Sequence, residues 1–124
     1  MVRNILALVA GLVAGSVVNM GIVTIGFAVI PLADPTYESP LETKNLIFPF
    51  AAHALGTLAG AAVASLIALS YRLWISLAIG ALFLMGGIAA VSMIVAPLWF
   101  EAVDLIVAYI PMAWLGWKLT GGKR

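Results

Sequence analysis

The sequence contains no cysteine and few charged side chains. It has 6 Lys and Arg and 5 Asp and Glu among 124 residues, so charged residues make up 9% of the chain, against about 25% in an ordinary soluble domain. Without cysteine there is no disulfide, thiolate zinc site, iron–sulfur cluster or cysteine nucleophile. A formal net charge of +1 supplies no basic field for nucleic acid, so we expect no nucleic-acid partner.

Apolar residues take the place of the missing charge and make up 65% of the chain. A soluble globule of this composition would have too few polar side chains to cover its surface. The composition therefore predicts an integral membrane protein, with the lipid bilayer as its surroundings. The length allows one domain, over residues 1–124.

Four stretches are long enough to cross a membrane as helices, which takes about 20 mostly apolar residues. In lipid only helices and closed barrels satisfy the backbone, and these runs lack the alternation of barrel strands. The first run is longer than the apolar core of a secretory signal. Short turns follow the second and third runs, so we expect an antiparallel bundle of four transmembrane helices. These helices are expected over about 4–31, 45–71, 73–96 and 98–118, with an outer loop over 31–44.

Basic residues are distributed unevenly between the two sides of the predicted bundle. Only Lys44 lies on the side of the 31–44 loop, and the other basic residues lie at the opposite side: Arg3, Arg72, Lys118, Lys123 and Arg124. The positive-inside rule then places both termini in the cytoplasm. The acids all lie on the loop side: Asp34, Glu38, Glu42, Glu101 and Asp104.

Small residues recur every four positions in the first two predicted helices. Gly11 and Gly15 share one line with Asn19, and Gly56 and Gly60 share another. Such rows let two helix backbones approach closely in lipid. The sequence leaves two uses open, which are packing within one bundle and a homo-oligomer interface.

Pro111 lies inside the fourth predicted helix. Proline has no N–H group, so it frees the carbonyl of Val107 and predicts a kink. Neighbouring helices tolerate such kinks in membranes. A packing adjustment is the simplest interpretation, and a hinge or ligand pocket is the alternative.

Polar residues within the spans gather in the outer half of the predicted bundle. At 1.5 Å per residue, His53 and Asp104 both lie about 10 Å below the outer boundary. Glu101 lies one turn nearer the surface, while Asn19 and Thr57 lie deeper. Polar groups are costly inside a membrane, so these five residues form the candidate polar network of the protein.

Two interpretations of this network are open. A histidine beside two carboxylates can hold a proton, a cation or another ligand, because opposite charges attract strongly away from water. Alternatively, Glu101 and Asp104 cap the first turns of their own helix, and His53 donates to a backbone carbonyl or to Asp104 with no further role. Neither a metal nor another cofactor is expected, since no ligand spacing such as HExxH is present.

Catalytic motifs are missing from the sequence. It contains no P-loop, no nucleophile elbow and no GxGxxG turn, so we do not expect an enzyme. An enzyme acting on lipid or quinone within the membrane is the least favoured possibility.

Three segments resemble a family of small bacterial proteins with four transmembrane helices. They are GLVAGSVVNMG at 11–21, FPFAAHALGTLAGA at 48–61 and GGIAAVSMIVAPLWFEAVDLIVAYIPMAWLG at 86–116. The resemblance implies a multi-pass protein of the bacterial cytoplasmic (inner) membrane, and it implies no activity, cofactor or residue role.

These features favour a small, non-enzymatic scaffold or accessory subunit that binds a second copy of itself or another membrane protein. The alternative is a small oligomeric channel or carrier for protons, cations or a small solute, which would use the polar cluster around His53 and Asp104. The direction in which the side chains of His53 and Asp104 point distinguishes the two hypotheses. A shared cavity favours transport, whereas a capped Asp104 and a sealed His53 favour a scaffold.

Overall fold

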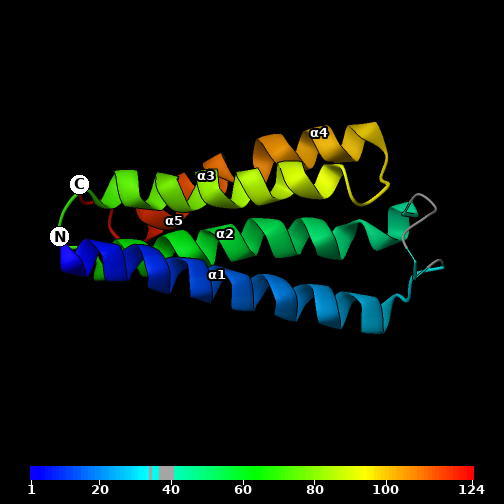
Figure 1. The fold of residues 1–124 in the computed structure, drawn as a ribbon, viewed down its shortest axis with the longest axis horizontal. Coiled ribbons are helices and arrows are strands. Elements are labelled where there is room, and N and C mark those ends of the chain that lie inside the picture. Colours follow the sequence, from blue (N-terminus) through cyan, green and yellow to red (C-terminus); the bar gives the residue numbers. More distant parts are fainter. Residues whose placement is uncertain (34, 37–40) are drawn as a thin grey trace.

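The computed structural model of the chain describes residues 1–33, 35–36 and 41–124. The acids Asp34 and Glu38 lie outside the described residues. The described ranges are helical and contain no strand, which confirms the predicted all-α class (Figure 1). The elements are α1 (Val2–Val29), a short 3-10 turn η1 (Thr43–Asn45), α2 (Ile47–Ile67), α3 (Arg72–Val91), α4 (Leu98–Val107) and α5 (Ile110–Leu119).

Four stretches are long and apolar enough to cross a membrane, with α4 and α5 counted together over Leu98–Leu119. They run alternately up and down, so that the N- and C-termini lie at one end of the bundle (Figure 1). We call this the termini end, which also contains the 68–71 turn. The opposite, loop end contains the 41–46 segment and the 92–97 connection.

Two of the helices are shorter than the sequence predicted. The helix predicted over 45–71 ends at Ile67, because Ala68 adopts an extended backbone and Tyr71 a left-handed one with φ 53°. The helix predicted over 73–96 ends at Val91. Its final turn is followed by Ser92, whose hydroxyl donates to the Ala89 carbonyl at 2.7 Å. Apolar residues continue beyond both ends, so hydropathy could not locate them.

The predicted helix over 98–118 is interrupted just before Pro111, where the sequence predicted a kink. It divides at Ala108 and Tyr109 into α4 and α5, and Pro111 lies in the first turn of α5. Proline has no N–H for the Val107 carbonyl and its ring crowds that carbonyl, so the hydrogen-bond ladder stops there. Proline in a first helical turn costs nothing, which explains why a new helix begins at once.

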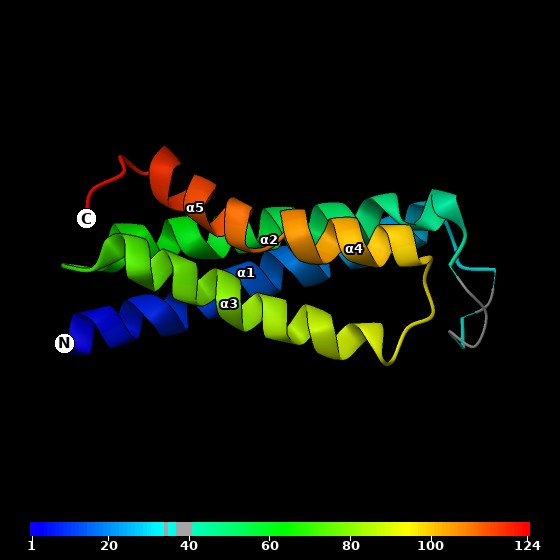
Figure 2. The same ribbon diagram turned by 90° about the horizontal axis from the view of Figure 1, so that it is seen from above.

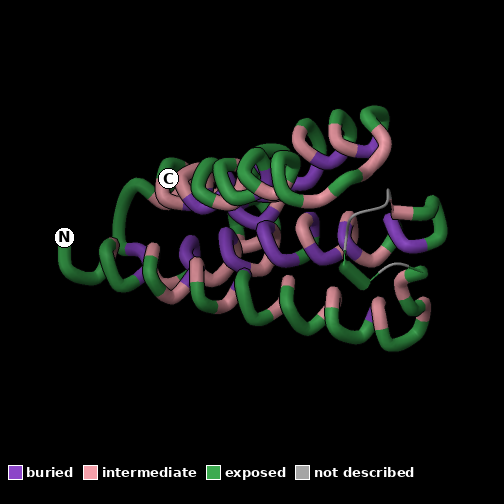
Figure 3. Tube along the Cα trace, turned by 45° about the vertical axis from the view of Figure 1, so that its right-hand side comes forward, coloured by how far each residue is buried: buried purple, intermediate pink, exposed green. Residues whose placement is uncertain are grey.

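Helix α2 lies at the centre of the bundle and packs against α1, α3 and α5. Figure 2 shows α4 and α5 following one another end to end, beside α2 and α3. Buried residues follow α2 along most of its length, whereas the outer faces of the surrounding helices are exposed (Figure 3). Those exposed faces carry large apolar side chains such as Val17, Met85 and Ile106.

The predicted glycine rows of α1 and α2 meet within one chain. A Cβ added at Gly11 would lie 2.6 Å from the Gly60 carbonyl oxygen, and one added at Gly60 would lie 2.6 Å from the Gly11 carbonyl oxygen. Gly15 and Gly56 are related in the same way, at 2.7 and 2.9 Å. The backbones are therefore so close that neither row has room for a side chain. The glycine rows therefore serve the packing of α1 against α2 within one chain, which is the first of the two uses that the sequence left open.

The termini half of the bundle is filled by a small apolar cluster. Ala61 and Ala64 from α2, Ile79 from α3 and Ala113 from α5 are all fully buried there. The hydroxyl of Ser76 is also buried and donates to the Ala61 carbonyl at 3.1 Å. Small side chains thus let three helices close against one another in this half.

Candidate functional site

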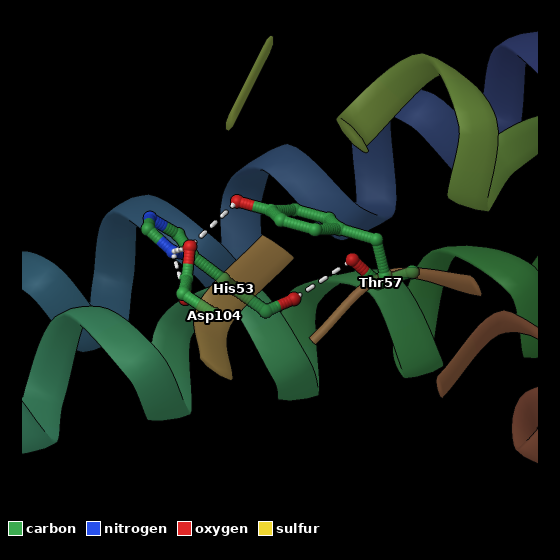
Figure 4. A network of polar contacts seen from close by, with 4 residues as sticks. His53, Thr57 and Asp104 are labelled. Carbon is green, nitrogen blue, oxygen red and sulfur yellow. Dashed lines mark hydrogen bonds and ion pairs between the residues drawn. The ribbon is translucent and has the colours of Figure 1, made fainter. Parts of the chain in front are cut away.

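His53 of α2 and Asp104 of α4 form a direct pair in the loop half of the bundle, each six residues from the loop end of its helix. Figure 4 shows their side chains pointing toward one another. Nδ1 of the imidazole lies 2.8 and 3.0 Å from the two carboxylate oxygens. Asp104 is 5% exposed, and the His53 side chain is 25% exposed. A carboxylate away from water requires a donor, and His53 supplies one from a different helix.

Tyr109 is the second donor to the same carboxylate. Its hydroxyl donates to Oδ2 of Asp104 at 3.3 Å, and its ring stacks on the His53 imidazole with centroids 5.8 Å apart. Tyr109 is 3% exposed. In an unbroken helix, residues five apart lie about 140° apart around the axis. The interruption before Pro111 is what allows Tyr109 to reach Asp104. The resemblance to small four-helix proteins draws attention to Tyr109, but the predicted polar network did not include it.

Gly87 of α3 makes room for the Tyr109 hydroxyl. A Cβ added at Gly87 would lie 2.5 Å from that oxygen and 2.7 Å from the ring carbon that bears it. The adjacent Gly86 has nothing within 4 Å of an added Cβ. The absence of a side chain at Gly87 therefore determines where the tyrosine ring can lie.

Two cavities meet at His53. The outer cavity, on the loop side, has a volume of about 150 Å³, and the inner cavity has a volume of about 240 Å³. His53, Gly87 and Ala90 line both of them. The imidazole therefore stands at the boundary between the two spaces.

The outer cavity combines apolar walls with two carboxylates. Phe27, Ile94 and Phe100 contribute apolar surface, and Glu101 and Asp104 contribute the acidic groups. In sequence these acids are three residues apart, and both line this cavity as the helical spacing predicted. No side-chain cap bond is made at the start of α4, although Glu101 lies in its first turn, where a carboxylate suits the helix dipole.

The inner cavity is more polar and contains a buried acceptor without a partner. Asn19, Thr57 and Tyr109 line it together with His53. Oδ1 of Asn19 is buried and makes no hydrogen bond with the described residues. A buried acceptor without a partner costs about 1–3 kcal/mol, so a water molecule or a ligand with an N–H or O–H group fits this position.

Thr57 has a local role. Its hydroxyl donates to the His53 carbonyl one turn earlier at 2.8 Å (Figure 4), a common use of threonine within helices. Thr57 lines the inner cavity, but its proton is already engaged. The structure thus joins His53, Asp104 and Tyr109 directly, and places Glu101 and Asn19 in the cavities on either side of His53.

Metal binding has little support in this geometry. Within the described residues, no three His, Asp or Glu side chains are close enough together to hold a metal ion. Comparison with known proteins adds no information about the site, because no family model, curated protein or solved structure matches the chain.

Proposed function

We propose that the protein is a small multi-pass membrane carrier that binds a proton or a small cation at the His53–Asp104 pair. The observation that carries this proposal is the position of Asp104, which is buried, held by donors from His53 and Tyr109, and open to the outer cavity. Ionisable groups inside a membrane span are costly and mark ion or proton pathways.

His53 is the group suited to exchange the proton. Nδ1 lies against the carboxylate, while Nε2 makes no hydrogen bond with the described residues. When Nδ1–H donates to Asp104, Nε2 is free to accept a proton from the cavity, and the carboxylate then stabilises the imidazolium. Glu101 also lines the outer cavity, and it lies about one helical turn nearer the loop end than Asp104. Its carboxylate is therefore suited to attract cations towards the pair.

A carrier fits the packing better than an open channel does. The inner cavity reaches Gly15 and Phe83, and towards the termini end the bundle is closed by Ala61, Ala64 and Ile79. Passage therefore requires a rearrangement of the helices. The interruption at Ala108 and Tyr109 lies beside the pair and is the natural place for such a change.

A scaffold or accessory subunit is the second candidate. It is favoured by the close α1–α2 packing and by the exposed apolar faces of α1 and α3, which could contact a partner as well as lipid. Under this hypothesis the polar cluster serves stability alone. Because His53 and Asp104 share a cavity, transport is the better-supported function.

The expected location is a bacterial cytoplasmic membrane with both termini inside the cell. Four apolar stretches support a multi-pass arrangement. The basic residues collected at the termini end support that orientation, because positive charge is retained in the cytoplasm.

Proton flux into liposomes tests the function. Purified protein is reconstituted with an internal pH-sensitive dye, and an acid pulse is applied with potassium and valinomycin to balance charge. We expect acidification faster than in empty vesicles. Asp104→Asn and His53→Gln should each slow it about tenfold or more, because each removes a hydrogen bond to a charged group, worth about 1.5–3 kcal/mol.

Glu42→Gln is the matched control, since it makes the same carboxylate-to-amide change at a surface position whose side chain is 52% exposed. Its flux should equal that of the wild type. Sodium and potassium fluxes are measured in the same vesicles. Equal flux through the wild type and Asp104→Asn, with both proteins folded by circular dichroism, would contradict the proposal and favour the scaffold.

A further inference from the structure

The termini end of the bundle is positively charged without compensation. Arg3, Arg72 and Lys118 lie there with Lys123 and Arg124, whereas the described acids Glu42, Glu101 and Asp104 all lie in or beside the loop half. An excess of positive charge at a membrane surface attracts anionic lipids. Charge alone does not make a binding site, but two hollows at this end are shaped by specific side chains.

An apolar groove of about 490 Å³ separates the first turns of α1 and α3. Ile5 and Leu8 line it from α1, and Ile75 and Ala78 line it from α3. Trp74, Ile75 and Ala78 form one stripe of α3, which extends about 6 Å along the axis at 1.5 Å per residue, and Tyr71 precedes the helix at the end of this stripe. The groove is therefore an elongated apolar channel open to the surroundings of the bundle.

A second hollow of about 430 Å³ adjoins the mouth of this groove. Tyr71 and Trp74 line both spaces, and Arg124 lines the second. Tyr71 and Trp74 are each 69% exposed. Amphipathic rings of this kind favour the boundary between hydrocarbon and headgroups, so the apolar groove and the basic hollow meet where a phospholipid changes from chain to headgroup.

The mouth of the groove offers hydrogen-bond donors to an anion. Ser70 accepts from Asn4 through its oxygen at 2.9 Å and keeps its own proton free. Arg3 and Arg72 line neither hollow but are the sequence neighbours of the groove-lining Asn4 and Tyr71. Each uses Nε to bond a carbonyl at the end of α2, at 2.7 and 2.9 Å, which leaves its terminal amino groups without a described acceptor. An arginine fork of this kind suits the oxygens of a phosphate.

We infer that this composite surface, lined by Tyr71, Trp74 and Arg124, binds an anionic phospholipid. One acyl chain occupies the groove between α1 and α3, and the phosphate lies between Arg124 and Ser70, which line the two adjoining hollows. The inference rests on insertion in a membrane, which belongs to the proposed function, and it does not depend on transport by the His53–Asp104 pair.

Native mass spectrometry of the detergent-purified chain tests the inference. Phosphatidylglycerol and phosphatidylcholine with the same acyl chains are titrated side by side. We expect phosphatidylglycerol to bind at least about fivefold more tightly, the equivalent of one basic residue near an anionic headgroup. Arg124→Gln should remove most of this preference, and Trp74→Ala should weaken binding of both lipids.

Two control variants separate this surface from charge and aromatic content in general. Lys44→Gln removes a cation at the loop end, and Trp114→Ala removes an exposed tryptophan that lines neither hollow. Both should bind phosphatidylglycerol as the wild type does. Glycerol phosphate, which has no acyl chains, should not displace the lipid at equal concentration.

Three results would overturn the inference. They are equal binding of the two lipids, a loss in Lys44→Gln as large as in Arg124→Gln, and displacement by glycerol phosphate. Because lipid binding is measured without flux, its failure would leave the carrier proposal intact. Failure of proton flux, in turn, would leave the lipid site intact.

Discussion

Replacing Gly87 by alanine tests whether the position of Tyr109 depends on the space at that glycine. The added Cβ would lie 2.5 Å from the tyrosine hydroxyl oxygen. Tyr109 is 3% exposed, so its ring cannot move into solvent and must shift towards the inner cavity, which it lines together with Gly87. Its bond to Asp104, already 3.3 Å long, should then be lost.

Gly86→Ala isolates the steric effect. Both substitutions gain up to about 1 kcal/mol from the higher helix propensity of alanine, but an added Cβ at Gly86 meets nothing within 4 Å. Overpacking at Gly87 costs about 1–3 kcal/mol, so the two variants should differ in unfolding free energy by about that amount. Loss of the bond to the carboxylate increases the difference.

Thermal unfolding followed by circular dichroism in one detergent measures this difference. A change of 1 kcal/mol corresponds to roughly 2–8 °C in a protein of this size class, with Gly87→Ala the less stable variant. Adding Tyr109→Phe to Gly87→Ala should recover part of the loss, because it removes the closest atom. Equal melting temperatures for the Gly86 and Gly87 variants would refute the reasoning.

Two further predictions concern the bundle as a whole. Gly60→Ala should destabilise the protein by about 1–3 kcal/mol, because the Cβ would meet the Gly11 carbonyl at 2.6 Å, whereas Gly21→Ala, with nothing within 4 Å, should be neutral or stabilising in the same melting assay. Since the chain has no cysteine, single replacements can report the orientation. Glu42→Cys should react with a membrane-impermeant maleimide on intact cells and Leu69→Cys only after permeabilisation; the reverse pattern would invert the predicted topology.

Much of the candidate site could be predicted from linear depth along the helices. His53 and Asp104 lie at similar distances from the loop end, and counting residues at a fixed rise was enough to expect them at one level. Glu101 follows from its spacing to Asp104. Tyr109 could not be found in this way, because its position depends on a helix interruption, and a proline predicts a disturbance without giving its direction or size.

Composition and length by themselves determined that this chain forms apolar helices long enough to span a membrane, since the distribution of charge and apolar residues is a property of the sequence. Helix ends, the mutual facing of the two glycine rows and the joining of His53, Asp104 and Tyr109 were decided by tertiary structure. These features depend on the rotation of each helix about its axis. That rotation is fixed by contacts between helices rather than by hydropathy, because apolar residues lie on every side of α1, α2 and α3.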